Sequence, residues 1–231
     1  MNIWVAFPSA NIDRANQASA LWRARGYRVA ILTDSNATPD CDLLICGPRP
    51  YRGYWGSCNR LCSILTSRAT APGGIVADIV VLAADDIEPD QTREAREIGE
   101  EFKLHFPDLF GVMQPCGDPQ GKDQHGIPAA ARICGSPWLG REWIRRAYGG
   151  RGATNDRYFH FYGDEELYLV AERLKVLWMR PDVTQFHRHW SWGWNPITRY
   201  QEQNQKTWHE DQDLFMIERS AGFPGSEPLE A

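Results

Sequence analysis

The sequence predicts an α/β protein with a mainly parallel central sheet flanked by helices, and three observations support this class. Short apolar runs alternate with amphipathic stretches through the first half of the 231-residue chain, as in βαβ units. The most apolar run, 79–84, is typical of a central strand covered on both faces. Hydrophobic residues make up 42% of the chain and charged residues 24%, so a sizeable core can form.

The first three strands are short and β-rich. The chain opens with a predicted strand at 3–7, and a helix follows at 13–25, where apolar residues recur at helical spacing before Gly26. Residues 27–33 predict the second strand and 42–46 the third.

A second helix is expected at 57–68. Cys58 and Cys62 lie four residues apart on it, which favours two reduced core residues over a metal or redox pair; the chain has six cysteines and no C-x-x-C pair. After the central strand, a long helix is predicted at 91–106, because its apolar residues stand three to four positions apart and its charged residues take the other face.

The second half is less regular. It predicts a strand at 110–114, a polar loop at 115–129 and a strand followed by a helix across 136–148. A further amphipathic helix is predicted at 164–175. The last residues, 221–231, are rich in Gly, Pro and Glu, so we expect them to be disordered.

The net charge is −5, which excludes a protein that coats nucleic acid by bulk positive charge. Basic residues nevertheless gather locally, since residues 130–200 hold eleven Lys and Arg against seven Asp and Glu. Phosphate contacts are one interpretation of this excess, and a solvated helix face with internal ion pairs is the other. The arginines concerned are Arg141, Arg145, Arg146, Arg151 and Arg157.

No apolar run approaches the roughly 18 to 20 residues of a membrane span, and the first seven residues lack the basic and apolar segments of a signal peptide. We therefore expect a cytoplasmic protein without membrane insertion.

Asp85 and Asp86 come directly after the most apolar strand. Ligands of open α/β sheets gather beyond the carboxyl ends of the strands, and paired aspartates there can hold Mg²⁺ or Mn²⁺ beside a bound diphosphate. The alternative is structural: Asp86 or Asp90 caps the following helix, which Pro89 opens.

Two later motifs carry further candidates. Asp164, Glu165 and Glu166 stand at a predicted helix start, where they form either an ordinary acidic first turn or a general base that projects into a cleft. His187 and His189 are two residues apart and would share one face of a strand, a spacing suited to one metal ion.

Tryptophan is concentrated late in the chain, where seven of the ten tryptophans follow residue 135. Trp190, Trp192 and Trp194 alternate with Ser and Gly, as in flat platforms for sugar rings or bases. Core packing is the alternative, above all for Trp143 and Trp178.

Taken in chain order, these motifs resemble those of GT-A-fold glycosyltransferases of the family 2 type. The resemblance implies one Rossmann-like GT-A domain at 1–219, with a nucleotide-binding half at 1–110 and an acceptor-binding half at 111–219. A flexible tail follows at 220–231.

The resemblance also implies roles for single residues. Asp164 becomes the catalytic base, with Glu165 as the alternative because Gly163 stands where the family has glutamate. The implied metal ligands are Asp85, Asp86, His187 and His189. The implied nucleotide-binding residues are Pro8, Ser9, Asp34, Asn59 and Asp85.

Two segments, 111–118 and 135–141, are similar to the phage-encoded branch of these enzymes, which glycosylates hydroxymethylated pyrimidines in DNA. This similarity implies an acceptor such as 5-hydroxymethylcytosine. The sugar- and acceptor-binding residues that it implies are Gln114, Asp118, Ser136, Trp138, Arg141 and Trp190.

The implied reaction is an inverting transfer of a sugar from a nucleotide-diphosphate sugar, with a UDP-sugar as the expected donor and Mn²⁺ or Mg²⁺ as the cofactor. Three alternatives remain: transfer to a cell-envelope glycan or lipid, a nucleotidyltransferase, and a non-catalytic sugar- or nucleic-acid-binding module. The chain has only four lysines and no N-terminal Gly-rich phosphate loop, which argues against a nucleotidyltransferase.

Overall fold

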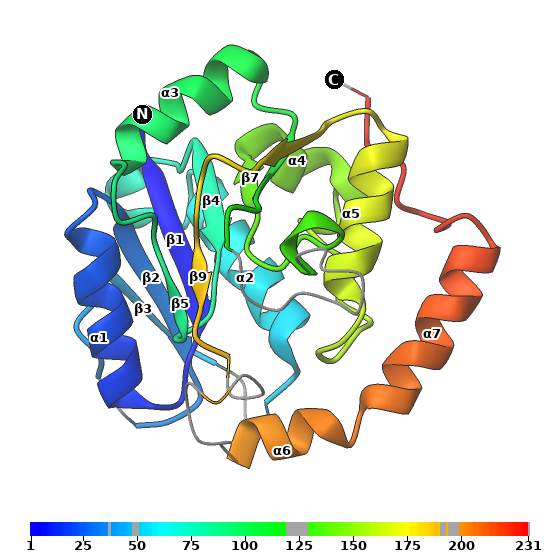
Figure 1. The fold of residues 1–231 in the computed structure, drawn as a ribbon, viewed down its shortest axis with the longest axis horizontal. Helices are drawn as coiled ribbons and strands as arrows, with labels where there is room; N and C mark the ends of the chain where they lie inside the picture. Colours follow the sequence, from blue (N-terminus) through cyan, green and yellow to red (C-terminus); the bar gives the residue numbers. More distant parts are fainter. Residues whose placement is uncertain (37, 48–50, 119–128, 190–192, 194–198, 231) are drawn as a thin grey trace.

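A computed structural model describes residues 1–36, 38–47, 51–118, 129–189, 193 and 199–230. Its centre is a seven-stranded sheet with the strand order β3-β2-β1-β4-β7-β6-β8, and helices cover both faces (Figure 1). The predicted class, an α/β protein with a mainly parallel sheet, is confirmed.

The first half of the sheet is wholly parallel. It contains β1 (Ile3–Pro8), β2 (Arg28–Thr33), β3 (Leu43–Cys46) and β4 (Ile79–Leu82). All four strands were predicted at nearly these positions. Because they are parallel, the residues that follow them meet at one edge of the sheet.

The second half reverses direction. β7 (Trp138–Gly140) lies antiparallel between β4 and β6 (Val112–Pro115), and β6 pairs in parallel with β8 (Leu177–Arg180). A separate small sheet joins β5 (Ile87–Glu88) to β9 (Phe186–His187) in antiparallel fashion. The sequence did not predict β5, β8 or β9.

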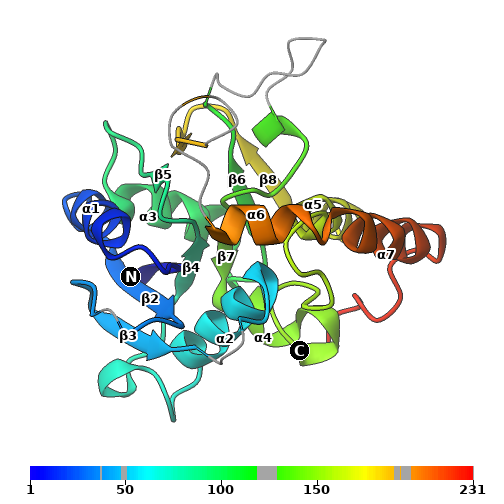
Figure 2. The ribbon, with the colours of Figure 1, turned by 90° about the horizontal axis from the view of Figure 1, so that it is seen from below.

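Five helices cover the sheet (Figures 1 and 2). One core layer packs α1 (Ile12–Arg23) and α3 (Ala95–His105) on one face, and the other layer packs α2 (Tyr54–Thr66), α4 (Arg141–Arg146) and α5 (Gly163–Arg173) on the opposite face. Short 3-10 turns occupy Pro72–Gly74, Ala129–Ala131 and Ala147–Gly150.

Two further helices follow β9 in the chain: α6 (Arg199–Gln205) and α7 (Trp208–Ser220). Figure 2 shows them running one after the other across the molecule. Phe215 of α7 is buried in the core layer on the side of α5. The sequence analysis predicted neither helix.

The start of α3 corrects the capping interpretation of the acidic segment. The helix begins at Ala95, after Glu94, so neither Asp86 nor Asp90 caps it. Asp90 instead accepts hydrogen bonds from the backbone N–H and hydroxyl of Thr92 and from the backbone N–H of Thr184. Hydrophobic periodicity predicted that the helix starts at 91. The bonds of Asp90 instead keep residues 90–94 in a non-helical segment before it.

The tail also differs from the prediction, because residues 221–230 pack against the domain. Phe223 and Ser226 are buried. The backbone of Glu227 accepts a hydrogen bond from Gly149, and Leu229 donates one to Arg146. Backbone hydrogen bonds and two buried side chains thus order a segment whose composition indicated disorder.

All six cysteines are free, and Cys58 and Cys62 are fully buried. None of the helices in the described part of the chain combines the length and the apolarity that crossing a bilayer requires.

Candidate active site

A cavity of about 700 Å³ opens at the carboxyl edge of the parallel strands. Pro8 and Ser9 reach it from the end of β1, Asp34 from the end of β2, and Asp85 and Asp86 from beyond β4. The structure therefore brings together five predicted site residues that are separated by up to 78 positions in the sequence.

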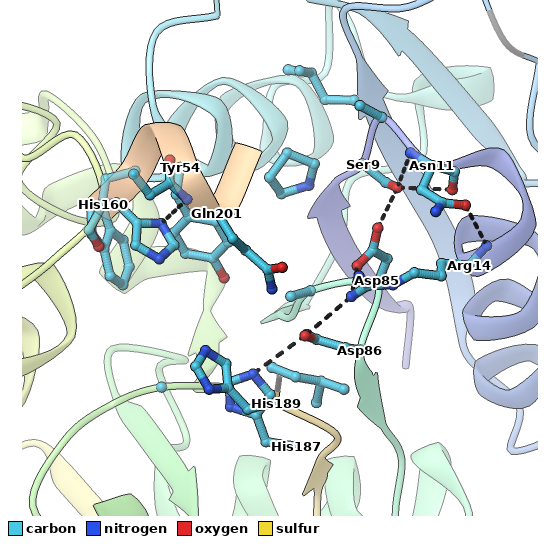
Figure 3. A pocket seen from close by; sticks show the side chains of 18 of the residues that line it. Ser9, Asn11, Arg14, Tyr54, Asp85, Asp86, His160, His187, His189 and Gln201 are labelled. Carbon is cyan, nitrogen blue, oxygen red and sulfur yellow. Dashed lines mark hydrogen bonds and ion pairs between the residues drawn. The ribbon is translucent and has the colours of Figure 1, made fainter. Parts of the chain in front are cut away.

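The two adjacent aspartates bind different partners. Asp85 accepts a hydrogen bond of 2.6 Å from the Ser9 hydroxyl. Arg14 Nη2 lies 2.5 Å from Asp85 Oδ1 and 3.1 Å from Asp86 Oδ2. On its other side, Asp86 Oδ1 lies 3.4 Å from His187 Nε2, so that Asp86 stands between a guanidinium and an imidazole (Figure 3).

The small sheet brings the histidines to this place. Ile87 pairs with His187 across β5 and β9, and Arg188 donates a backbone hydrogen bond of 2.7 Å to the carbonyl of Asp86. The rings of His187 and His189 lie 4.9 Å apart, centre to centre. Both histidines line the cavity, and because β9 ends at His187, His189 lies just beyond the strand.

The pKa values of Asp85 and Asp86 are shifted in opposite directions. Burial raises the pKa of Asp85 above its ordinary value despite the ion pair with Arg14. Burial also acts on Asp86, but the hydrogen bond with His187 and the nearby positive charge outweigh it, and the pKa of Asp86 is lowered. Asp86 is therefore the stronger anion of the pair.

The donor set suits a divalent cation. Asp86 Oδ1 and His187 Nε2 are 3.4 Å apart, and two ligands at right angles on an ion with bonds of about 2.1 Å stand about 3 Å apart. Among the described residues, no group of three or more His, Cys, Asp or Glu side chains is arranged as a complete metal site. Asp86 and His187 are thus a close pair of candidate metal ligands.

Asp164 lines the same cavity from the first turn of α5. Burial and the nearby charge of Glu165 raise its pKa to about 6. Glu165 donates its backbone N–H to the Asp164 carboxylate, but its own side chain is not among the residues that line the cavity. Of the two candidate bases, Asp164 has the position that a base requires.

Packing explains why glycine stands at position 163, where the family that the sequence resembles has a glutamate. A β-carbon at Gly163 would collide with the indole ring of Trp55. Glycine therefore lets the start of α5 lie against α2, which places Asp164 beside the aromatic residues at the start of α2.

The sequence analysis missed these aromatic residues. Tyr54 and Trp55 line the cavity from α2, and His160 and Phe161 line it from the loop before α5. The Tyr54 hydroxyl donates to the carbonyl of Ala83, and Trp55 Nε1 donates to the carbonyl of His160. Three aromatic residues after the third strand, at positions 51, 54 and 55, were the available sequence signal.

The cavity consequently has two ends. In Figure 3, Ser9, Asn11 and Arg14 lie on one side of Asp86, whereas Tyr54 and His160 lie on the other. Gln201 and Asn204 of α6 also line the cavity, and both were missed because the helix that carries them was not predicted.

Asn59 does not line the cavity, contrary to its implied nucleotide contact. Its side chain oxygen accepts hydrogen bonds from the backbone N–H groups of Ala153 and Thr154, and its nitrogen donates to the carbonyl of Thr154. Through these bonds the buried amide of Asn59 holds the loop at residues 153–154 against α2.

Three implied acceptor residues lie in a buried network behind the cavity. The Gln114 side chain accepts the backbone N–H of Ser136, and Gln185 accepts from Trp138 Nε1 while it donates to the Ser136 carbonyl. Trp138 is fully buried, so the expectation that it contacts a ligand is wrong. Gln114 and Ser136 are also buried and lie outside the cavity lining.

Asp118 and Arg141 are likewise outside the lining, for different reasons. Asp118 is buried and accepts the backbone N–H of His187, so it supports the β9 strand. Arg141 is at the wrong end of the sheet, because β7 runs antiparallel to β4 and its last residue pairs with Ile79. The Arg141 guanidinium binds Asp78, just before β4 begins. Trp190 lies outside the described residues.

The locally basic half uses its arginines internally. Arg145 pairs with Glu142, and Arg157 pairs with Glu218. Arg146 and Arg151 donate to backbone carbonyls of the C-terminal segment, at Leu229 and Gly225. The ion-pair interpretation therefore describes Arg145 and Arg157, whereas backbone carbonyls engage Arg146 and Arg151.

No protein-family model and no curated protein matches the chain, so the functional argument rests on the site itself.

Proposed function

We propose that this protein is a divalent-metal-dependent inverting glycosyltransferase of the GT-A type. The observation that carries the proposal is the contact of 3.4 Å between Asp86 and His187 in a cavity that also holds Asp164. The order of these residues in the chain is the order of the family motifs that they resemble.

The donor nucleotide, a UDP-sugar in the simplest case, occupies the end near Pro8, Ser9 and Asp34. Asp86 and His187 would hold Mn²⁺ or Mg²⁺, which neutralises charge on a departing diphosphate. Asp34, which follows β2 and lines this end, contacts the base of the nucleotide.

Asp164 acts on the acceptor. Its carboxylate takes the proton of the acceptor hydroxyl while that oxygen forms the bond to the anomeric carbon, and the bond from this carbon to the diphosphate oxygen breaks. The products are the glycosylated acceptor and a nucleoside diphosphate. A base in this position contributes about 10²- to 10⁴-fold to the rate.

The acceptor proposal is a hydroxymethylated pyrimidine in DNA, and it rests on the resemblance of segments 111–118 and 135–141. Mass spectrometry after incubation with mixed nucleotide sugars tests it on three acceptors: DNA containing hydroxymethylcytosine, the free nucleoside, and a lipid. A hexose-sized mass gain on the DNA supports the proposal. A gain on the lipid alone assigns the enzyme to the cell envelope instead.

The donor reaction has its own test. We expect UDP to bind in the presence of Mn²⁺ and to bind less tightly after addition of EDTA or in Asp86→Asn. Release of a nucleoside diphosphate supports glycosyl transfer, whereas release of pyrophosphate indicates a nucleotidyltransferase. Absence of binding by any nucleoside diphosphate, with and without metal, would overturn the proposal.

A further inference from the structure

Asn204 of α6 is a buried amide that the protein satisfies only in part. The residue is 6% exposed and lines the cavity. Its Nδ2 lies 3.1 Å from His160 Nδ1. Its Oδ1 has no hydrogen-bond partner in the part of the chain that the structure describes. A buried amide oxygen without a partner is costly, so a ligand is the natural candidate to satisfy it.

One polar atom of the Asn204 amide lacks a partner in either orientation of that amide. If the oxygen and nitrogen of Asn204 exchange places, the oxygen faces His160 and the nitrogen takes the unpaired position. Burial lowers the pKa of His160 to about 4, so the imidazole is neutral near pH 7, and in the tautomer that is protonated at Nε2 its Nδ1 accepts from Asn204 Nδ2. This arrangement leaves Oδ1 as the free acceptor.

The backbone of His160, the residue that Asn204 contacts, is held firmly. Its backbone N–H donates to Asp211 over 2.9 Å, and its carbonyl accepts from Trp55 Nε1 over 2.8 Å. Asn204 therefore contacts a residue with an anchored backbone, as a site for selective recognition requires.

The surroundings indicate what kind of molecule donates to it. The rings of Tyr54 and Phe161 both lie edge-on to His160, and Tyr54 also contacts Trp55, so these residues share one end of the cavity. Asp164 lines the cavity beside them, because the preceding Gly163 packs on Trp55. Aromatic walls favour a flat, unsaturated ring over a charged or branched group. The unpaired oxygen requires an N–H or O–H on the edge of that ring.

We propose that the aromatic end of the cavity is the acceptor subsite and that Asn204 selects the acceptor by receiving a hydrogen bond from an N–H or O–H donor on a flat ring. The assignment of this end to the acceptor rests on the proposed function, because it requires Asp164 to be the base. Recognition of a donor-bearing ring by Asn204 does not depend on it.

Two small probes test the recognition directly. Benzamide and methyl benzoate have similar shapes, but only benzamide carries N–H donors. We expect benzamide to bind the wild-type protein about tenfold more tightly in an NMR or calorimetric titration, a ratio in the range of one buried hydrogen bond. In Asn204→Leu, which keeps the branched shape of the side chain and removes the amide, the two dissociation constants should differ by less than about twofold.

Gln203→Ala is the matched control, because Gln203 is exposed on the same helix and should keep the tenfold ratio. If Asn204→Leu does not fold, Asn204→Ala removes the same amide and gives the same comparison. Three results would each overturn the proposal: equal binding of both probes to the wild type, binding of neither, or a benzamide preference that survives loss of the amide.

The same variants separate this inference from the proposed function. UDP with Mn²⁺ binds at the opposite end, so Asn204→Leu should leave its dissociation constant unchanged. A wild-type protein that fails to bind UDP counts against the glycosyltransferase, while the comparison of the two probes still decides the role of Asn204.

Discussion

The guanidinium of Arg14 lies 3.1 Å from the Asp86 carboxylate, on the opposite side of that carboxylate from His187. The same nitrogen also contacts Asp85. A cation that binds Asp86 must therefore compete with a positive charge that is already present.

This competition predicts that Arg14→Gln binds Mn²⁺ more tightly. Removing one positive charge within about 4 Å of a partly buried site should raise the affinity by about tenfold or more. Calorimetry with Mn²⁺ and no nucleotide measures it. Arg23→Gln is the control, because Arg23 lies at the other end of α1 and pairs with Asp40 and Asp42. Unchanged or weaker binding in Arg14→Gln would contradict the prediction.

The two candidate bases should separate in a rate measurement. Asp164→Asn should lower the transfer rate by about 10²- to 10⁴-fold because no other group at its position can take the proton. Glu165→Gln should stay within about threefold of the wild type, because its side chain does not line the cavity. UDP binding checks that both variants keep the donor end intact. A larger loss in Glu165→Gln would assign the base to Glu165.

The pH dependence of transfer follows from the same carboxyl group. Its pKa of about 6 means that Asp164 is protonated, and inactive as a base, in more acidic solution. The maximal rate should fall about tenfold for each unit of pH below 6 and level off above about 7. Measuring the rate between pH 4.5 and 8 tests this fall. A rate that does not change across pH 6 would argue against Asp164 as the base.

Stability should respond in the opposite sense. The pKa of Asp164 is raised from 3.8 to about 6 in the folded protein, so folding binds the proton more tightly and loses stability as the pH rises through this range. Asp164→Asn should therefore unfold with a free energy about 1 to 3 kcal/mol larger at pH 8. The gain should shrink toward pH 4. Urea unfolding at the two pH values gives the comparison, and a less stable variant at pH 8 contradicts it.

Asp211 of α7 should be a major support of the loop before α5. Its carboxylate accepts the backbone N–H groups of Phe159, His160 and Phe161. Asp211→Ala leaves three donors unpaired and should lower the free energy of unfolding by about 2 to 5 kcal/mol. Asp213→Ala, at an exposed position of the same helix, should change it by less than about 0.5 kcal/mol. Similar effects in both variants would show that the three bonds contribute little.

Local pattern was enough to predict the parallel half of the sheet. The strands before Asp34 and Asp85 are short apolar runs, and parallel βαβ units necessarily bring the carboxyl ends of their strands to one edge. Asp85 and Asp86 could thus be assigned to a site at this edge from the sequence pattern, whereas the family resemblance supplied Pro8, Ser9 and Asp34.

The position of Arg141 in the acceptor half could not be predicted from local pattern in the same way, because it depends on the direction of the preceding strand. The resemblance placed Arg141 near a ligand. The strand at 138–140, which Arg141 follows, runs against its neighbours, so Arg141 lies at the far edge beside Asp78. A three-residue strand carries no local signal of its direction, which is set by the strands that it joins.

What the sequence by itself determined is the class of fold and the acidic strand end, since both follow from periodicity along the chain. Only the tertiary structure decided that β9 lies on β5 and carries His187 to Asp86, and that α6 carries Asn204 to His160. Each of these contacts joins residues at least 44 positions apart through the packing of separate elements, and no local pattern encodes such a distance.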